Sequence, residues 1–302
     1  MSHHYRLSQL KIDSAFELPE LSSWDGAPDT RGDIVFRIGK VPQGLEKPDH
    51  VGPDFQTRGR CEYLVALPGS GRILVQGGNK ITVEPDPGTD PADTRAFLTG
   101  PVQAVLWHQR GLLPLHASVV ARDGRAAAIA GASGTGKSTL AAALAGRGLE
   151  VLADDICVVD VPAGAAPTAL PGIRRLRLWR DALEHLQIPT QKLPQALGGK
   201  EKFLLDCSEP LNGPRRLVAV VVLMPEASGA VAIERLRGAL ALATIRSVVH
   251  MSEVARALAR DLDIFTVLAR LVAAGVTVWR LRFPADLASL NETAARVLAA
   301  LE

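Results

Sequence analysis

Residues 131 to 138 match the phosphate-binding loop pattern G-x-x-x-x-G-K-[S/T] at every fixed position, and this stretch strongly limits what the chain can fold into. The residues before it, Arg125 to Ala130, form a short apolar run typical of a buried strand. Ser138 to Arg147 predict a helix, which Gly148 ends. A strand, a glycine-rich loop and a helix in this order predict an α/β domain that binds phosphate groups at the start of the helix.

Each fixed residue of the loop has a physical role. The glycines let the backbone curl so that successive N–H groups point at phosphate oxygens. Lys137 is expected to bring its charge to the β- and γ-phosphates, and the Ser138 hydroxyl is expected to bind Mg²⁺. The nucleotide-binding residues that the pattern predicts are Gly131, Ala132, Ser133, Gly134, Thr135, Gly136, Lys137, Ser138 and Thr139.

A pair of carboxylates follows the next predicted strand. Glu150 to Ala153 is followed by Asp154 and Asp155, and Asp154 lies seventeen positions after Lys137. In an open α/β sheet ligands bind beyond the carboxyl ends of the strands, so we expect both acids to lie beside the γ-phosphate. One is predicted to orient or deprotonate an attacking hydroxyl, and the other to hold Mg²⁺ or its waters. An acid so soon after the loop favours a phosphotransferase over a motor ATPase; a solvated Asp-Asp turn is the alternative.

His116 is the third candidate site residue. It lies fifteen positions before Gly131, near the end of an apolar segment that predicts a neighbouring strand. A histidine beside two aspartates keeps its positive charge more readily and can tune a catalytic carboxylate. A structural histidine bonded to the backbone is the alternative.

The rest of the chain suggests two domains. Residues 1–98 contain short β-type runs separated by Pro/Gly/Asp-rich turns, which predict a small, mostly antiparallel β module. Residues 99–302 mix strands and helices around the loop and predict the catalytic α/β domain. Among the later segments, Arg174, Arg175, Arg177, Lys200 and Lys202 are candidates for phosphate-facing charge, and Trp179 and Trp279 are expected in the core.

Composition excludes several classes of protein. The chain has 302 residues, of which 47% are hydrophobic and 22% charged, and its net charge of +2 gives no electrostatic footprint for nucleic acid or a membrane surface. No apolar run is long enough to cross a membrane, and the start of the chain lacks an apolar signal core. The three cysteines have no metal-ligand spacing and indicate reduced thiols, so we expect a cytoplasmic protein.

Taken together, these features resemble the catalytic domain of the bacterial HPr kinase/phosphorylase family. The resemblance lies in His116, the loop Gly131-Ala-Ser-Gly-Thr-Gly-Lys-Ser138 and Leu152-Ala-Asp-Asp155, in this order and at this spacing. The chain is also similar to a divergent branch of HPr-kinase-like proteins through Gln109 to Ser118 and Leu178 to Leu183. Some members of that branch phosphorylate the C-terminal serine of a lasso-peptide precursor.

The resemblance implies an ATP- and Mg²⁺-dependent serine kinase acting on a peptide or small protein, with the fold of HPr kinases and phosphoenolpyruvate carboxykinases. It implies that Lys137 binds the phosphates, that Ser138 and Asp155 bind the metal, and that Asp154 is the general base, assisted by Asp155 and His116. Family relatives are homo-oligomers. The chain departs from the family pattern in three ways. Ala117 follows the histidine, and Thr139 follows the loop serine. The family also carries a glutamate near the metal in a later segment (the metal-side Glu), and this chain has no clear counterpart of it.

Two other functions stay open at this point. One is a small-molecule kinase of the shikimate or gluconate type; against it, about 130 residues precede the loop and no arginine-rich lid is evident. The other is a nucleotide-binding regulator without transfer activity, which the missing metal-side Glu favours.

Overall fold

The computed structural model describes residues 2–24, 32–196, 201–207 and 213–301. The chain divides into two compact units. Unit 1 contains Met1–Pro114 and Met251–Ile264, and unit 2 contains Leu115–His250 and Phe265–Glu302. The chain therefore leaves unit 2 after His250, contributes a short segment to unit 1, and returns at Phe265.

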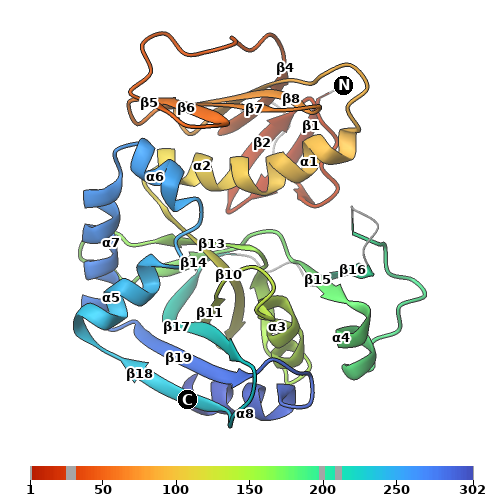
Figure 1. The fold of residues 1–302 in the computed structure, drawn as a ribbon, viewed down its shortest axis with the longest axis vertical. Coiled ribbons are helices and arrows are strands. Elements are labelled where there is room, and N and C mark those ends of the chain that lie inside the picture. Colours follow the sequence, from red (N-terminus) through yellow and green to blue (C-terminus); the bar gives the residue numbers. More distant parts are fainter. Residues whose placement is uncertain (1, 25–31, 197–200, 208–212, 302) are drawn as a thin grey trace. The chain divides into compact units, whose positions relative to one another are not determined.

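Unit 1 is built on a nine-stranded sheet in the order β3-β1-β2-β4-β9-β8-β7-β6-β5 (Figure 1). Most neighbours are antiparallel, but β4 pairs in parallel with both β2 and β9. The β-type runs of the sequence at 33–38, 63–67, 72–76 and 80–84 correspond to β4, β7, β8 and β9. The strands are β1 His3–Leu7, β2 Leu10–Ser14, β3 Ser22–Ser23, β4 Ile34–Ile38, β5 His50–Val51, β6 Phe55–Arg58, β7 Glu62–Leu67, β8 Gly71–Gln76 and β9 Lys80–Glu84.

Two helices complete the N-terminal part of unit 1. The helix α1, Pro91–Thr99, begins with the Asp90 side chain accepting a hydrogen bond from the Ala92 N–H at 2.8 Å. The helix α2, Pro101–Gln109, buries Trp107 completely. The domain boundary expected at 98/99 falls at the last residue of α1, whereas the compact units divide after Pro114, because both helices belong with the N-terminal sheet.

The segment 251–264 is fixed to unit 1 by polar contacts. It contains α6, Ser252–Ala257, and the start of α7, Asp261–Ala273. The Thr57 hydroxyl donates to the Ala257 carbonyl at 2.8 Å, and Arg60 pairs with Asp263 at 2.6 Å. The buried Arg260 guanidinium donates to the His108 carbonyl.

Unit 2 combines helices with an eight-stranded mixed sheet. This agrees with the α/β class that the sequence predicted. Its strands β11, β17 and β19 are parallel neighbours, whereas β10 is antiparallel to β11 and β12 on its two sides. The strands are β10 Leu113–Arg122, β11 Arg125–Ala130, β12 Glu150–Ala153, β13 Ile156–Asp160, β14 Thr168–Leu170, β17 Arg215–Glu226, β18 Ala232–Leu236 and β19 Thr277–Pro284.

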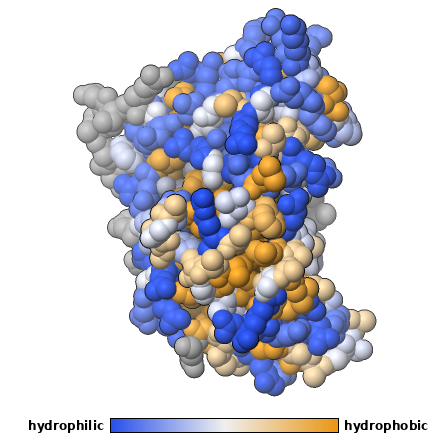
Figure 2. Space-filling model, turned by 90° about the vertical axis from the view of Figure 1, so that its left-hand side faces the viewer, coloured by the Kyte–Doolittle hydropathy of each residue, from blue (hydrophilic) through white to orange (hydrophobic). Residues whose placement is uncertain are grey.

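Helices cover both faces of this sheet (Figure 1). Leu140, Ala141 and Leu144 of α3 are buried in a core shared with α8 and the sheet. The opposite side carries α5 and α7, whose outer surface exposes apolar side chains, with Leu240 at 49% and Phe265 at 55% (Figure 2). The helices are α3 Lys137–Ala145, α4 Arg180–His185, α5 Gly238–Arg246 and α8 Leu290–Leu301. Among the described helices, none combines the length and the apolar character that crossing a membrane requires.

A separate two-stranded sheet consists of β15, Arg175–Trp179, and β16, Lys202–Asp206. Its residues alternate between two faces, as expected for strands. Leu176, Leu178 and Phe203 are buried in the core of unit 2. The prediction that Trp179 lies in the core is wrong, because Trp179 lies on the opposite face of this two-stranded sheet and is 42% exposed.

Candidate active site

The site lies at one edge of the unit 2 sheet, where three strands bring their chemistry together. Because β10 is antiparallel to β11 and β12, the ends of β11 and β12 lie at the same edge as the start of β10. The register pairs Ala117 with Ala130 and Val119 with Ala153. Each site residue is next to one of these paired residues: His116 directly precedes Ala117, Gly131 follows Ala130, and Asp154 follows Ala153. The sheet therefore brings all three predicted features to one place.

The phosphate-binding loop connects β11 to α3. Gly134 and Gly136 have φ of 84° and 88°, values that L side chains rarely adopt. The loop is closed by the Thr135 hydroxyl, which donates to the Ala132 carbonyl at 2.9 Å. Ala132, Ser133 and Gly134 are exposed, so the loop is open to an incoming ligand. The unpaired N–H groups at the start of α3 add partial positive charge at this position.

Lys137 is buried and held at the loop. Its Nζ lies 3.1 Å from the Gly131 carbonyl, 2.9 Å from the Ala132 carbonyl and 2.9 Å from Nε2 of His116. An ammonium group can only donate, so Nε2 of His116 accepts and Nδ1 carries the proton. Burial lowers the pKa of Lys137, and the nearby Asp155 and Asp154 oppose that shift.

Asp154 is 5% exposed and is held by two hydroxyl groups. Ser118 donates to its Oδ1 at 2.5 Å, and the Ser138 hydroxyl lies 3.0 Å from both of its oxygens. Burial raises the pKa of Asp154, and the negative charge of Asp155 raises it further, while the two hydroxyl bonds lower it. The Ser138 hydroxyl therefore contacts the carboxylate of Asp154, while the assignment of Ser138 and Asp155 as metal ligands, which the resemblance implied, stays a prediction.

Asp155 faces the other way and is more accessible. Its backbone is in the left-handed region, with φ of 70°, and its carbonyl accepts from the Ala117 N–H at 3.2 Å. This conformation turns the carboxylate toward His116 Nδ1 at 3.3 Å and the Arg177 guanidinium at 3.5 Å. The side chain is 34% exposed. Of the two acids, Asp155 is the one that an incoming group can reach.

His116 is fixed by its neighbours on both sides. Its Nδ1 lies 3.1 Å from the Asp155 carbonyl, and its ring stacks on His250 with centroids 5.1 Å apart. Burial, followed by the charge of Lys137, lowers the pKa of His116. Burial also lowers the pKa of His250 to about 4, helped by His116. Both rings are therefore neutral near pH 7, so His116 is not the cation that the sequence suggested.

Two residues of the site were missed from the sequence, and a third was named but not singled out. Ser118 and His116 are two positions apart on one strand, so the period of two placed both on the same face and could have revealed Ser118. His250 lies far along the chain and follows no motif, and no signal in the sequence identified it. Arg177 was one of three arginine candidates, and the sequence did not distinguish it from the other two.

The other expected site residues lie in several places. Arg174 donates to the carbonyls of Val151 and Cys207, and Arg175 pairs with Asp206, so neither faces the loop. Lys202 stands near the site on β16. Lys200 lies outside the described residues. Thr139 is half-buried in the first turn of α3.

The residues present fit a magnesium ion. Mg²⁺ takes oxygen ligands, keeps several waters and is bound by one or two protein groups together with substrate phosphates. The Ser138 hydroxyl and the Asp154 carboxylate provide such oxygens side by side at the loop. Within the described ranges no cluster of three or more His, Cys, Asp or Glu side chains is arranged to hold a metal.

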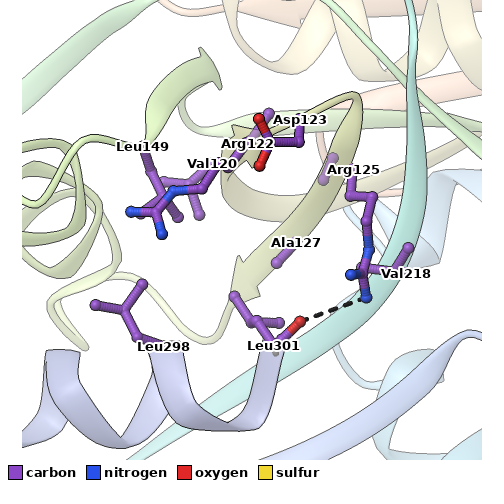
Figure 3. A pocket seen from close by; sticks show the side chains of 11 residues that line it. Val120, Arg122, Asp123, Arg125, Ala127, Leu149, Val218, Leu298 and Leu301 are labelled. Atoms are coloured by element: carbon purple, nitrogen blue, oxygen red, sulfur yellow. Dashed lines mark hydrogen bonds between the residues drawn. The ribbon is translucent and has the colours of Figure 1, made fainter.

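A cavity of about 460 Å³ adjoins the loop, within the usual size range of small-molecule sites. It is lined by His116, His250, Gly131, Ala132, Thr135, the end of β17 at 222–225 and the segment 247–249. A second cavity of about 240 Å³ lies at the other end of β11, between Arg125, Leu298 and Leu301 (Figure 3). The strand separates this second cavity from the loop, so it has no part in the site.

Among solved structures, the Hpr(Ser) kinase/phosphatase from Coxiella burnetii is similar to this chain, with a TM-score of 0.32 and 13% sequence identity. The match covers 62% of this chain and 96% of that chain. No protein-family model matches the chain, and no curated protein matches it. A TM-score this low does not establish a shared fold, so function has to be inferred from the site itself.

Proposed function

We propose that the protein is an ATP- and Mg²⁺-dependent kinase that phosphorylates a serine of a peptide or small protein. One observation carries the proposal: the phosphate-binding loop meets an acid pair directly, with the Ser138 hydroxyl 3.0 Å from both carboxylate oxygens of Asp154. A loop that only stores nucleotide does not need a second, accessible carboxylate beside its lysine. The pair provides two acids with different tasks: Asp154 to help hold the metal at the donor phosphates, and Asp155 to accept the proton of the acceptor hydroxyl.

Donor binding falls to the loop. Lys137 exchanges its contacts with the Gly131 and Ala132 carbonyls for oxygens of the β- and γ-phosphates, and the N–H groups at the start of α3 bind the same phosphates. Ser138 and Asp154 would hold Mg²⁺, which when bound neutralises charge on the donor phosphates. The exposed loop residues leave room for the donor to enter, and the adjoining cavity leaves room for the rest of the nucleotide.

The acceptor hydroxyl meets Asp155. The Asp155 carboxylate accepts the hydroxyl proton as the serine oxygen bonds to the γ-phosphorus; the bond from that phosphorus to the β,γ-bridging oxygen breaks, and ADP is the leaving group. His116 links the two halves of the site, because its Nε2 contacts Lys137 while its Nδ1 contacts Asp155. This division of roles reverses the one implied by the family resemblance, in which Asp154 was the base and Asp155 the metal ligand. The reason is that Asp154 is buried against Ser138 whereas Asp155 is accessible.

The experiment is a transfer assay with the purified full-length protein, γ-labelled ATP, Mg²⁺ and a peptide library with a fixed central serine. A lasso-peptide precursor ending in serine is the first specific acceptor to include, because of the family resemblance. We expect labelled phosphoserine with the wild type and none with Lys137→Ala, whose fold is checked by circular dichroism. ATP binding without transfer to any peptide would instead indicate a regulator, and transfer only to hydroxylated metabolites a small-molecule kinase.

A further inference from the structure

The exposed face of the two-stranded sheet β15–β16 has features that packing does not explain. One face of this sheet is buried, with Leu176 and Leu178 at 0% exposure. The strand period then turns Arg177, between these two leucines, and Trp179, after the second, to the other face. Arg177 has 52% of its side chain exposed and Trp179 is 42% exposed. A tryptophan exposed to this degree on a regular strand contributes little to the core and leaves its ring accessible to a group from outside the chain.

Lys202 completes this surface. Lys202 lies opposite Trp179 in the register of β15 and β16, and its Nζ lies 4.5 Å from the centre of the indole ring. The other charges on and beside these two strands pair with one another, since Arg175 lies 2.5 Å from Asp206 and Arg180 lies 3.3 Å from Glu201. In the part of the chain that the structure describes, Lys202 has no ion pair, and Arg177 has only Asp155.

The surface leads directly into the acid pair. The Arg177 guanidinium lies 3.5 Å from Asp155 Oδ2. Besides burial, which is the larger cause, the positive charge of Lys202 lowers the pKa of Lys137, so Lys202 also acts on the site. Arg177 and Trp179 are two residues apart on one strand, a spacing of about 7 Å, which an extended peptide covers in about two residues.

We propose that the face formed by Arg177, Trp179 and Lys202 binds the acceptor as an acidic peptide, with a carboxylate side chain one or two residues from the serine and an apolar side chain against Trp179. The inference rests on the proposed function, because it takes Asp155 as the point where the acceptor hydroxyl arrives. The positive charge left on the face selects a carboxylate, and the indole ring selects an apolar neighbour. Lys202 is the cation that meets the incoming carboxylate, while Arg177 stays beside Asp155.

The test uses two acetylated and amidated serine peptides that differ only in Asp or Asn next to the serine. With the wild type we expect kcat/KM for the Asp peptide to be higher by about tenfold, the size of one charge-assisted hydrogen bond. Lys202→Met should reduce this ratio to near one while KM for ATP stays within about twofold. Lys202→Glu should reverse the preference toward a peptide with Lys at that position. Trp179→Ala should raise KM for peptides with an apolar residue near the serine.

Arg175→Met is the matched control, because it removes a cation from the same strand that already has a partner in Asp206. It should leave the Asp/Asn ratio unchanged. An unchanged ratio in Lys202→Met, or a loss seen in KM for ATP instead of the peptide, would overturn the inference and leave the proposed function standing.

If no peptide is phosphorylated, binding of the fluorescently labelled Asp peptide is measured by anisotropy. Binding that Lys202→Met abolishes would then support the surface although the proposed function had failed. No binding to the wild type would overturn both.

Discussion

Asp154 and Asp155 are adjacent in the sequence but lie in different surroundings, and the loss of each should have a different effect. Asp155→Asn keeps the shape of the accessible acid and removes its ability to take a proton. We expect kcat to fall by about 100-fold or more, with the Kd of a non-hydrolysable ATP analogue nearly unchanged. Asp154→Asn should instead raise the Mg²⁺ concentration needed for half-maximal activity. Steady-state kinetics over a range of Mg²⁺ concentrations separates the two effects.

Asp123→Asn provides the matched control for Asp155. It is also an aspartate with a left-handed backbone, with φ of 52°, and it lies in the turn between β10 and β11 away from the site. Asparagine tolerates this conformation, so any loss seen only in the Asp155 variant is due to the carboxylate. If instead Asp155→Asn changes the Mg²⁺ requirement and Asp154→Asn does not, the division of roles proposed above is wrong.

His250 should make the stability of the protein depend on pH. Its pKa is lowered from 6.5 to about 4 in the folded chain, so between these values the unfolded chain binds a proton that the folded chain does not. Stability must therefore fall as the pH falls through this window. From pH 7 to about pH 4.5 this loss should reach about 2 kcal/mol. Urea unfolding of the wild type and of His250→Phe, which keeps a ring against His116, measures the difference. Parallel pH profiles of the two proteins would contradict the assignment.

At the scale of the elements, the sequence predicted which segments form strands and helices better than it predicted how they pair. Arg125 to Ala130 forms β11 as expected, because an apolar run before the glycine loop permits little else. The sequence did not show that β10 runs antiparallel between β11 and β12, since strand direction depends on the path of the connections. Asp154 still reaches the loop, because the two antiparallel steps restore the direction of β12.

Replacing a glycine by alanine should destabilise the protein at the start of α3 but not at its end. Gly136 has φ of 88°, and an added Cβ would meet nothing within 4 Å. Gly136→Ala should therefore cost about 1–2 kcal/mol through backbone strain alone, and weaken binding of ATP by displacing the first N–H groups of the helix. Chemical denaturation and nucleotide titration measure the two effects.

Gly146 at the other end of α3 is the control. Its φ of −60° suits alanine, and its nearest contact for a Cβ is 3.6 Å away. Gly146→Ala should be neutral or stabilise the protein slightly by restricting the unfolded chain. Equal losses in the two variants would mean that the helix, and not the left-handed loop position, is what responds.

For the whole molecule, the sequence predicted two domains in succession and gave no signal that residues 251–264 lie with the N-terminal sheet. Long-range contacts decide this membership. Thr57 bonds to Ala257 across 200 positions, and Arg260 bonds to His108 across 152. Local patterns carry no information about such pairs, because helix and strand periodicity reports only which face of an element is apolar. The same limit explains why His250 was missed, although His116 and Asp154 were found.

Nucleotide binding should be recorded in unit 2 alone. Unit 2 contains the loop, the acid pair and the histidine stack, so bound Mg²⁺ and ATP analogue should slow local opening there. Hydrogen exchange with and without the nucleotide measures this peptide by peptide. We expect increased protection at 131–140, around 154–156 and at 247–250, with the β7–β8 hairpin of unit 1 unchanged. Lys137→Ala should abolish the difference. Protection in β7 and β8 as well would show that the N-terminal sheet also responds to the nucleotide. The prediction that the response is confined to unit 2 would then be wrong.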